Sequence, residues 1–386
     1  MNQGPQKVVA FVAPYFPPDG GGSERYAYEI AFRLRKNHGW RVIFIASGER
    51  LGADTKEEID GITVYRLGYL FKLSNTPLSL VWPVKIKKIF EAEHPDIVNV
   101  NMPVPGIGDI AARFLHNEPL VVTYHAGSMK KGIWFIDAII ATYERAILPF
   151  LLSRADRIVS SSNSVRINFL ARYREKSITI TPGVDSSRFK PPEKSVHDPI
   201  VLFVAGLNHG ERYKGLDDLL EAIHLVRASI PNVTLTVIGD GDIRRHYEAR
   251  AKELGIRKNV IFAGKLTGDK LVAAYQEGYV LVMASSNESF GMVLLEAMAS
   301  RLPVIGTTVG DVPMIINDKK TGLLFTPHDT KALAEKLMML LGNPKRAAAF
   351  GRAGYRKAIT DFNWDHRAEH YDRLFGELIA KKIHDK

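Results

Sequence analysis

Short apolar, β-branched runs alternate with amphipathic stretches of helical length along the whole 386-residue chain. This alternation is typical of β-α-β units and predicts an α/β protein with parallel sheets. In the first half we predict seven strands, at residues 8–13, 42–46, 62–67, 96–102, 120–125, 157–161 and 177–181. In the second half we predict six, at residues 200–205, 233–238, 260–263, 279–284, 303–306 and 322–325.

The chain loses its apolar content between Arg188 and Pro199, where the segment RFKPPEKSVHDP holds three prolines and several charges. Such a composition is typical of a linker. We therefore predict two doubly wound domains, at residues 1–190 and 191–364. Residues 365–386 place apolar side chains at i, i+3 and i+4 spacing, which predicts a C-terminal helix that docks back across the cleft between the domains.

The composition excludes several classes of protein. The chain has no cysteine, so it can form no disulfide, thiolate nucleophile or Cys-ligated zinc site. The apolar run at residues 8–13 is too short for a secretion signal, and the apolar region at 133–152 is interrupted by charges and a proline, so we expect no spanning helix. We therefore expect a cytoplasmic protein that associates, at most, peripherally with the inner face of the cell membrane.

The net charge is +10, and residues 1–190 contribute 25 basic against 18 acidic side chains. A basic first half suits anionic partners, such as phosphorylated substrates, acidic lipid headgroups or nucleic acid. Because Lys and Arg are scattered and no recognised module is present, we do not expect a nucleic-acid partner.

Two segments of the first half suit an anionic membrane surface. They are VKIKKIF at 84–90, which has three lysines, and GIWFIDAII at 132–140, which directly follows Lys130 and Lys131. Each has an ordinary alternative, because the first is also typical of a surface helix and the second of a core helix that covers the sheet.

Ligands of doubly wound sheets bind in the loops at the carboxyl ends of the strands. After the first predicted strand, Gly20, Gly21 and Gly22 precede a predicted helix. Bare N–H groups at a helix amino end attract a phosphate through hydrogen bonds and the helix dipole. A flexible turn is the alternative interpretation of the three glycines.

The loop after the strand at 279–284 reads SSNESFGMVLLEAMAS and carries Glu288 and Glu296. We expect Glu288 in the loop, and Glu296 about two turns inside the following helix, on the side that faces its amino end. Carboxylates so placed are suited to accept hydrogen bonds from sugar hydroxyls, while N–H groups near residues 291–293 are suited to a diphosphate. Glu296 lies inside the apolar run VLLEAMA, so its charge needs a partner.

Four motifs occur in the same order along nearly the whole chain: PPDGGGSER at 17–25, TYHAG at 123–127, TPGVDSSRF at 181–189 and ESFGMVLLE at 288–296. Together they resemble the retaining nucleotide-sugar glycosyltransferases of family 4. The resemblance implies the GT-B fold, in which two Rossmann-like domains face a cleft. It also implies that the first domain binds the acceptor and the second binds the nucleotide-sugar donor.

The resemblance further implies roles for single residues. His125 is similar to the family's active-site histidine beside the reacting sugar, and Glu288 to the carboxylate that binds the sugar hydroxyls. Glu296 is similar to the ribose ligand, and Gly22, with its neighbour Gly21, to the loop that approaches the donor phosphate. The remaining donor contacts implied are Phe290, Gly291, Met292, Val293 and, beside the nucleotide base, Gly239.

The segment AGLNHGERYKGLDDLLEAI places Lys214 just before a predicted helix, where it is suited to neutralise a diphosphate, with Arg212 as its companion. Many relatives carry an arginine where this chain has Leu207, and we hypothesise that Arg212 replaces it. Because these groups and backbone N–H groups suffice to hold a phosphate, we expect no metal and no cofactor.

We therefore expect a retaining hexosyltransferase that moves a sugar from a nucleoside diphosphate sugar to a sugar or lipid-linked acceptor, such as a growing surface polysaccharide. A nucleotide-sugar epimerase on the same fold and a non-catalytic binding scaffold remain as alternatives. A dinucleotide-dependent dehydrogenase is not supported, because Gly239 and Gly241 are followed by Arg244 where the third glycine of its motif belongs.

Overall fold

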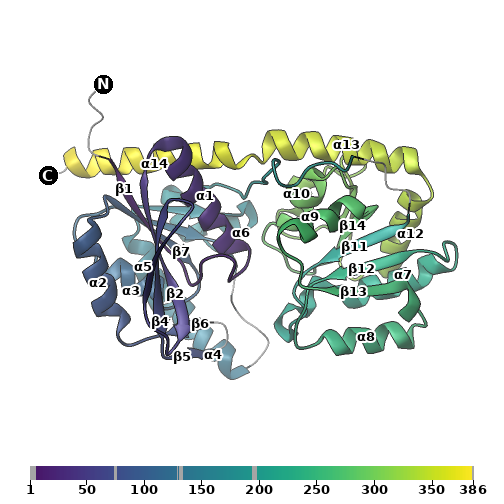
Figure 1. The fold of residues 1–386 in the computed structure, drawn as a ribbon, viewed down its shortest axis with the longest axis horizontal. Helices are drawn as coiled ribbons and strands as arrows, with labels where there is room; N and C mark the ends of the chain where they lie inside the picture. Colours follow the sequence, from purple (N-terminus) through teal and green to yellow (C-terminus); the bar gives the residue numbers. More distant parts are fainter. Residues whose placement is uncertain (1–5, 74–75, 128, 130–133, 194–197, 385–386) are drawn as a thin grey trace. The chain divides into compact units, whose positions relative to one another are not determined.

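The computed structural model describes residues 6–73, 76–127, 129, 134–193 and 198–384. The chain forms two compact units (Figure 1): unit 1 comprises Met1–Pro182 with Trp364–Lys386, and unit 2 comprises Gly183–Asn363. Unit 2 thus begins eight residues before the predicted boundary at 190/191. The reason is that this stretch packs within unit 2, where the Val184 N–H donates to the Phe362 carbonyl at 2.7 Å.

Unit 1 is built on an eight-stranded sheet in the order β10-β9-β8-β7-β1-β2-β4-β3. Its strands are β1 (Val8–Val12), β2 (Arg41–Arg50), β3 (Thr55–Ile59), β4 (Ile62–Tyr69), β7 (Ile97–Met102), β8 (Leu120–Tyr124), β9 (Arg157–Ser160) and β10 (Ser177–Thr179). All seven strands predicted in this half are confirmed, and they pair in parallel. The edge strand β3 was missed because its sequence TKEEI lacks apolar alternation, and it pairs antiparallel with β4.

Helices cover both faces of this sheet. On one face, the apolar side chains of α2 (Trp82–Glu93), α3 (Ile107–Arg113) and α5 (Leu148–Arg154) join those of the strands in one core. The other face is covered by α1 (Gly22–His38) and α14 (Trp364–His384). Also in unit 1 are a small hairpin of β5 (Phe71–Leu73) and β6 (Thr76–Leu78), α4 (Trp134–Thr142), the π-helical η1 (Tyr143–Ile147), α6 (Asn163–Asn168) and the 3-10 segment η2 (Ala171–Lys176).

The basic segment VKIKKIF lies in α2, and its apolar side faces the core. Ile86 and Ile89 are buried, and Lys85 pairs with Asp54 at 2.8 Å. The structure therefore supports the ordinary interpretation, a surface helix between two strands, over a membrane contact for this segment.

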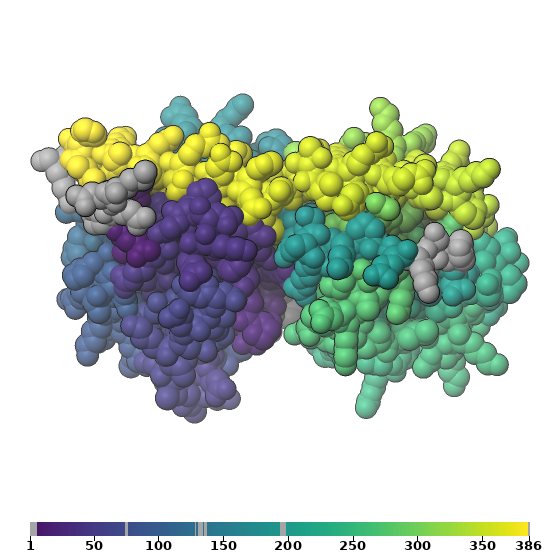
Figure 2. Space-filling model, turned by 45° about the horizontal axis from the view of Figure 1, so that its top comes forward, coloured from purple at the N-terminus to yellow at the C-terminus, as the bar shows by residue number. Residues whose placement is uncertain are grey.

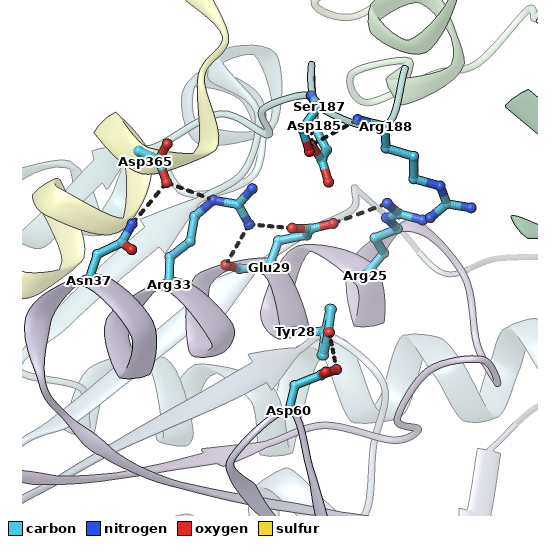
Figure 3. A network of polar contacts seen from close by, with 10 residues as sticks. All are labelled: Arg25, Tyr28, Glu29, Arg33, Asn37, Asp60, Asp185, Ser187, Arg188 and Asp365. Atoms are coloured by element: carbon cyan, nitrogen blue, oxygen red, sulfur yellow. Dashed lines mark hydrogen bonds and ion pairs between the residues drawn. The ribbon is translucent and has the colours of Figure 1, made fainter. Parts of the chain in front are cut away.

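The C-terminal helix α14 packs along α1 (Figure 2). Tyr371, Leu374, Phe375 and Leu378 are buried, as the spacing of the apolar residues predicts. At the start of the helix, Asp365 accepts hydrogen bonds from Arg33 and Asn37 of α1, and Arg33 also pairs with the buried Glu29 (Figure 3). The helix thus completes unit 1, and its predicted docking across a cleft stays a prediction.

Unit 2 is built on a six-stranded, fully parallel sheet in the order β13-β12-β11-β14-β15-β16. All six strands predicted in this half are confirmed. They are β11 (Ile200–Val204), β12 (Thr234–Ile238), β13 (Val260–Gly264), β14 (Val280–Met283), β15 (Val304–Thr307) and β16 (Leu323–Phe325).

The helices of unit 2 form two layers with separate cores. One core contains the apolar side chains of α7 (Leu216–Arg227), α8 (Arg244–Glu253) and α12 (Thr330–Leu341). The other contains those of α9 (Gly268–Glu277), α10 (Met292–Ala299), α11 (Val312–Ile315) and α13 (Pro344–Asp361). The 3-10 segments η3 (His209–Lys214) and η4 (Arg257–Asn259) complete the unit. Both units are thus Rossmann-like three-layer domains.

In each unit the strand order reverses beside the first strand. The reversal lies between β1 and β7 in unit 1 and between β11 and β14 in unit 2. The loops that follow such a pair of strands diverge to opposite faces of the sheet and leave a crevice at its carboxyl edge, where ligands of this architecture bind. The loops after β1, β7, β11 and β14 are therefore the places to look for a site.

Within the described residues, no helix combines the length and the apolar character needed to cross a membrane. The apolar region at 133–152 is instead divided among α4, η1 and α5.

We predict that α14 is essential to the stability of unit 1. Phe375 is fully buried and its ring contacts those of Phe11, Trp40 and Tyr371, so Phe375→Ala should lower the free energy of unfolding by about 3–5 kcal/mol. Urea unfolding followed by tryptophan fluorescence measures this, because all four tryptophans lie in unit 1. The matched control is Ile383→Ala on the exposed side of the same helix, and equal effects of the two changes would contradict the packing.

Candidate active site

Close backbone packing holds the loops after β11 and β14 of unit 2 together. Gly215 has φ +76°, and a Cβ there would lie 2.1 Å from the carbonyl oxygen of Ala284. One residue pair further out, the Ser286 N–H donates to the Tyr213 carbonyl at 2.7 Å. Only glycine permits this approach, which brings the end of η3 against the loop that carries Glu288.

Lys214 and Glu288 form an ion pair at this point, with 2.7 Å between Nζ and Oε2. Both side chains are largely buried, at 23% and 16% exposure. Burial by itself would lower the pKa of Lys214, but the nearby Glu288 and Tyr213 outweigh it, so the pKa lies above its ordinary value. Lys214 is therefore cationic at neutral pH, and it lies at the switch point of the sheet.

The amino end of α10 adjoins this pair along the chain. Gly291 caps the helix with φ +101°, a conformation that favours glycine. The N–H groups of the first helical turn, which includes Met292 and Val293, have no acceptor within the helix. The N–H groups near residues 291–293, which the sequence suggests for a diphosphate, thus lie at the start of a helix.

Glu296 lies just over one turn into α10, not two, because the helix begins only at Met292. Its Oε2 accepts a hydrogen bond of 2.7 Å from the Tyr275 hydroxyl of α9. This contact supplies the partner that the apolar surroundings of Glu296 require. Tyr275 gave no signal in the sequence, because its nearness to Glu296 depends on how α9 and α10 pack.

The resemblance implies that Phe290 contacts the donor, and its side chain is buried in the core of unit 2. Its ring lies 5.9 Å from that of Phe362, edge to face. A donor contact by Phe290 would therefore involve its backbone, and this contact stays a prediction.

Arg212 and Gly239 lie in neighbouring loops of unit 2. Arg212 is exposed, and its Nη2 lies 3.4 Å from Asp217 Oδ2 rather than beside Glu288. Gly239 has φ +145°, and a Cβ there would lie 1.8 Å from the carbonyl oxygen of Ala205, so tight packing already requires a glycine. The side chain of Leu207 is buried in the core, so the arginine found there in many relatives has no polar counterpart at this position.

In unit 1, His125 directly follows β8 and contacts the end of β7. Its Nε2 lies 2.9 Å from Asn101 Oδ1. Because the Asn101 amide nitrogen donates to Val12 and Asn99, its oxygen is the acceptor, and His125 carries its proton on Nε2. Burial lowers the pKa of His125 to about 3, so the ring is neutral and Nδ1 keeps its lone pair.

The glycine loop after β1 differs from expectation in one respect. The Gly21 N–H donates to Glu24 Oε2 at 2.8 Å, and so does the Ser23 hydroxyl. Glu24 is only 5% exposed, so a carboxylate of the chain itself occupies the Gly21 donor that the sequence assigned to a phosphate. Gly22, the first residue of α1, remains a candidate donor. Glu24 was missed, although a glutamate three residues after a helix cap is a recognisable capping signal.

A cavity of about 130 Å³ opens at the carboxyl edge of the unit 1 sheet. Glu24, Asn101 and His125 form its polar wall, and Met102 and Met129 part of its apolar wall. This cavity joins the loops after β1, β7 and β8, as expected for a ligand site at a switch point.

The predicted site residues therefore form two groups, each gathered within its own unit. Gly22 and His125 belong to unit 1, whereas Lys214, Glu288 and Glu296 belong to unit 2. In the part of the chain that the structure describes, no cluster of three His, Asp or Glu side chains is arranged to hold a metal ion.

Comparison with known proteins follows this division. Residues 20–188 match the family described as Glycosyltransferase Family 4, and residues 185–357 match that described as Glycosyl transferases group 1. The chain is 27% identical over 387 residues to O-antigen chain mannosyltransferase C of Escherichia coli, covering 97% of this chain and 100% of that protein.

Two solved structures are similar over nearly the whole chain. Sucrose-phosphate synthase from Thermosynechococcus elongatus matches with a TM-score of 0.80 and 22% identity, covering 97% of this chain and 100% of that one. Anabaena HepE in complex with UDP and glucose matches with a TM-score of 0.76 and 18% identity, covering 96% and 100%. The fold is therefore GT-B, as expected from the sequence motifs.

We predict that the His125 ring stays neutral between pH 8 and pH 5. Its NMR ring signals, assigned by their loss in His125→Gln, should not shift over this range, because the pKa lies near 3 in the folded chain. The unfolded chain binds the proton at about pH 6.5, so the free energy of unfolding should fall as the pH drops below that value, by at most about 1.4 kcal/mol per pH unit. In His125→Gln, this part of the pH dependence of the free energy of unfolding should be absent. A titration midpoint near pH 6.5 for the ring signals of the folded protein would contradict a neutral His125.

Proposed function

Because the chain belongs to the family 4 glycosyltransferases, which transfer sugars from nucleotide-sugar donors, we propose that it transfers a sugar from a nucleoside diphosphate sugar to a hydroxyl acceptor with retention of anomeric configuration. The observation that carries this proposal is the Lys214–Glu288 ion pair at the switch point of unit 2, followed along the chain by the amino end of α10. A cation, a row of N–H groups and two carboxylates together suit a sugar diphosphate.

Lys214 acts on the leaving group. When the bond between the anomeric carbon and the phosphate oxygen breaks, negative charge grows on the diphosphate. A cation and backbone N–H groups already fixed in place stabilise that charge without reorganisation. Lys214, with its raised pKa, and the first turn of α10 supply these groups, so the chemistry requires no metal.

Glu288 acts on the sugar. In the ligand-free chain its carboxylate neutralises Lys214. When a donor binds, the diphosphate takes over as the partner of Lys214, and Glu288 becomes free to accept hydrogen bonds from the sugar hydroxyls. The ion pair thus holds both side chains in place before the donor arrives.

The acceptor attacks the same face from which the diphosphate leaves. A bond forms between the acceptor oxygen and the anomeric carbon, the bond between the anomeric carbon and the phosphate oxygen breaks, and the acceptor proton passes to the departing phosphate.

The neutral His125 is suited to accept a hydrogen bond at Nδ1 from a hydroxyl, and not to donate a proton there. Its role is therefore positioning of a bound sugar in the cavity of unit 1.

A screen of the purified protein against UDP-, GDP- and ADP-sugars tests the function directly. Release of nucleoside diphosphate that depends on the donor sugar, and rises with an acceptor, supports transfer. A changed sugar nucleotide formed without any acceptor would instead indicate an epimerase.

We predict that Lys214→Ala lowers kcat/KM by roughly 10²–10³, because it removes a charge-assisted contact to the leaving diphosphate and leaves Glu288 without its partner. Arg212→Ala, which removes an exposed guanidinium of the same segment, should have a much smaller effect. Lys345→Ala on the surface of α13 is the matched control for loss of a lysine. Near-normal turnover of Lys214→Ala would show that the assignment is wrong.

We predict that Glu288→Gln and Glu296→Gln separate sugar transfer from nucleotide binding. Glu288→Gln should reduce transfer while calorimetry still measures nucleoside diphosphate binding, since Lys214 remains to hold the phosphates. Glu296→Gln should weaken nucleotide affinity, and Tyr275→Phe should do so to a lesser degree because it removes only the hydrogen bond to Glu296. If affinity collapses in Glu288→Gln and not in Glu296→Gln, the two roles must be exchanged.

A further inference from the structure

Exposed apolar side chains are distributed unevenly between the two units. Of the twenty large ones that the structure describes, fifteen belong to unit 1. Six follow β8 in the segment from α4 to Phe169, the residue that ends α6, and are here called the α4–α6 surface: Trp134, Ile139, Ile147, Phe150, Ile167 and Phe169. Trp134 is 83% exposed and Phe150 67%. Single apolar residues on a surface are ordinary, but such a group calls for an explanation.

None of the described side chains of α4 belongs to the core of unit 1. Its sequence WFIDAIIAT is strongly apolar, yet none of its described side chains is buried. A helix that covered the sheet would bury one apolar stripe, as α2 does with Ile86 and Ile89. The alternative expected from the sequence, a core helix, therefore does not hold for the described part of this segment.

Two contacts connect parts of this segment, α5 and Phe169, to η2 and to the loop of His125. The Tyr173 hydroxyl of η2 donates to the Pro149 carbonyl of α5 at 3.3 Å. A Cβ on Gly127, two residues after His125, would lie 2.6 Å from the ring of Phe169. The α4–α6 surface thus borders the loop that leads away from the cavity of unit 1.

The charge of this region complements an anionic partner. Between Trp134 and Lys176 the chain carries seven Lys or Arg against four Asp or Glu. Arg145, Arg154, Arg172 and Arg174 are exposed there, among the apolar side chains. Lys130 and Lys131, which the sequence places just before this segment, lie outside the described residues.

We propose that the α4–α6 surface docks onto an anionic lipid bilayer. Apolar and aromatic side chains enter the boundary between headgroups and acyl chains, and interspersed arginines bind lipid phosphates. Helix α2 suits this contact less well: Val84 is exposed, but Ile86 and Ile89 are buried in the core, and Lys85 and Lys87 pair with Asp54 and Glu91.

This docking also indicates the class of acceptor, an inference that rests on the proposed function. A surface that borders the His125 loop would bring the cavity of unit 1 to the headgroup level. The substrate class that fits is a hydroxyl acceptor carried on a lipid, which would reach the cavity without leaving the bilayer.

Flotation with liposomes of phosphatidylcholine and phosphatidylglycerol tests the docking without any donor or acceptor. The result therefore does not depend on whether the protein is a transferase. The protein should float with anionic vesicles, less so at high salt and not with pure phosphatidylcholine. Trp134→Glu combined with Phe150→Glu should lower the bound-to-free ratio by roughly tenfold or more, since both side chains are largely exposed. Leu225→Glu, an exposed apolar position on α7 of unit 2, is the matched control and should still float.

Three results would overturn the proposal. The first is a wild-type protein that ignores anionic vesicles at low salt. The second is loss of flotation when Lys85, Lys87 and Lys88 are all changed to Glu while the Trp134 and Phe150 variant still floats, because α2 would then be the contact. The third is a wild-type oligomer that the Trp134 and Phe150 variant converts to a monomer without altering flotation, which would make the surface an interface between copies of this chain.

Discussion

The ion pair between Lys214 and Glu288 is the contact on which the proposed donor site depends. It joins the two loops that diverge at the switch point of the unit 2 sheet, and it exists because Gly215 lets η3 approach Ala284. Each charge, largely removed from water, is stabilised by the other. The pair therefore places a cation beside a carboxylate, as the proposed binding of a sugar diphosphate requires.

Unit 1 uses the same architecture with different chemistry. At its switch point the polar groups are the neutral His125, oriented by Asn101, and the carboxylate of Glu24, which caps the glycine loop. None of these groups carries a positive charge, unlike Lys214 of unit 2. This difference supports the proposal that unit 2 supplies the cation for the sugar diphosphate and that unit 1 binds the hydroxyl acceptor.

The α4–α6 surface of unit 1 is a third feature of the molecule, beside the two candidate sites. The sheet of unit 1 is covered on one face by α2, α3 and α5 and on the other by α1 and α14, and none of the described side chains of α4 is buried. Apolar side chains left exposed on a helix are unfavourable in water unless something else covers them. A transferase that acts on a lipid-carried acceptor would have a use for such a helix beside its acceptor cavity.

The sequence by itself determined the strands of both sheets that follow the apolar pattern, the two-domain organisation and the residue types at the strand ends, because these depend on local periodicity and on glycines at loop ends. It did not determine the exposed edge strand β3, whose pairing with β4 leaves no apolar pattern. Only the tertiary structure decided that Lys214 meets Glu288, that Tyr275 satisfies Glu296 and that the ring of Phe290 packs against Phe362. These contacts join residues far apart in the chain, and their geometry follows from strand order and helix packing, which no local pattern specifies.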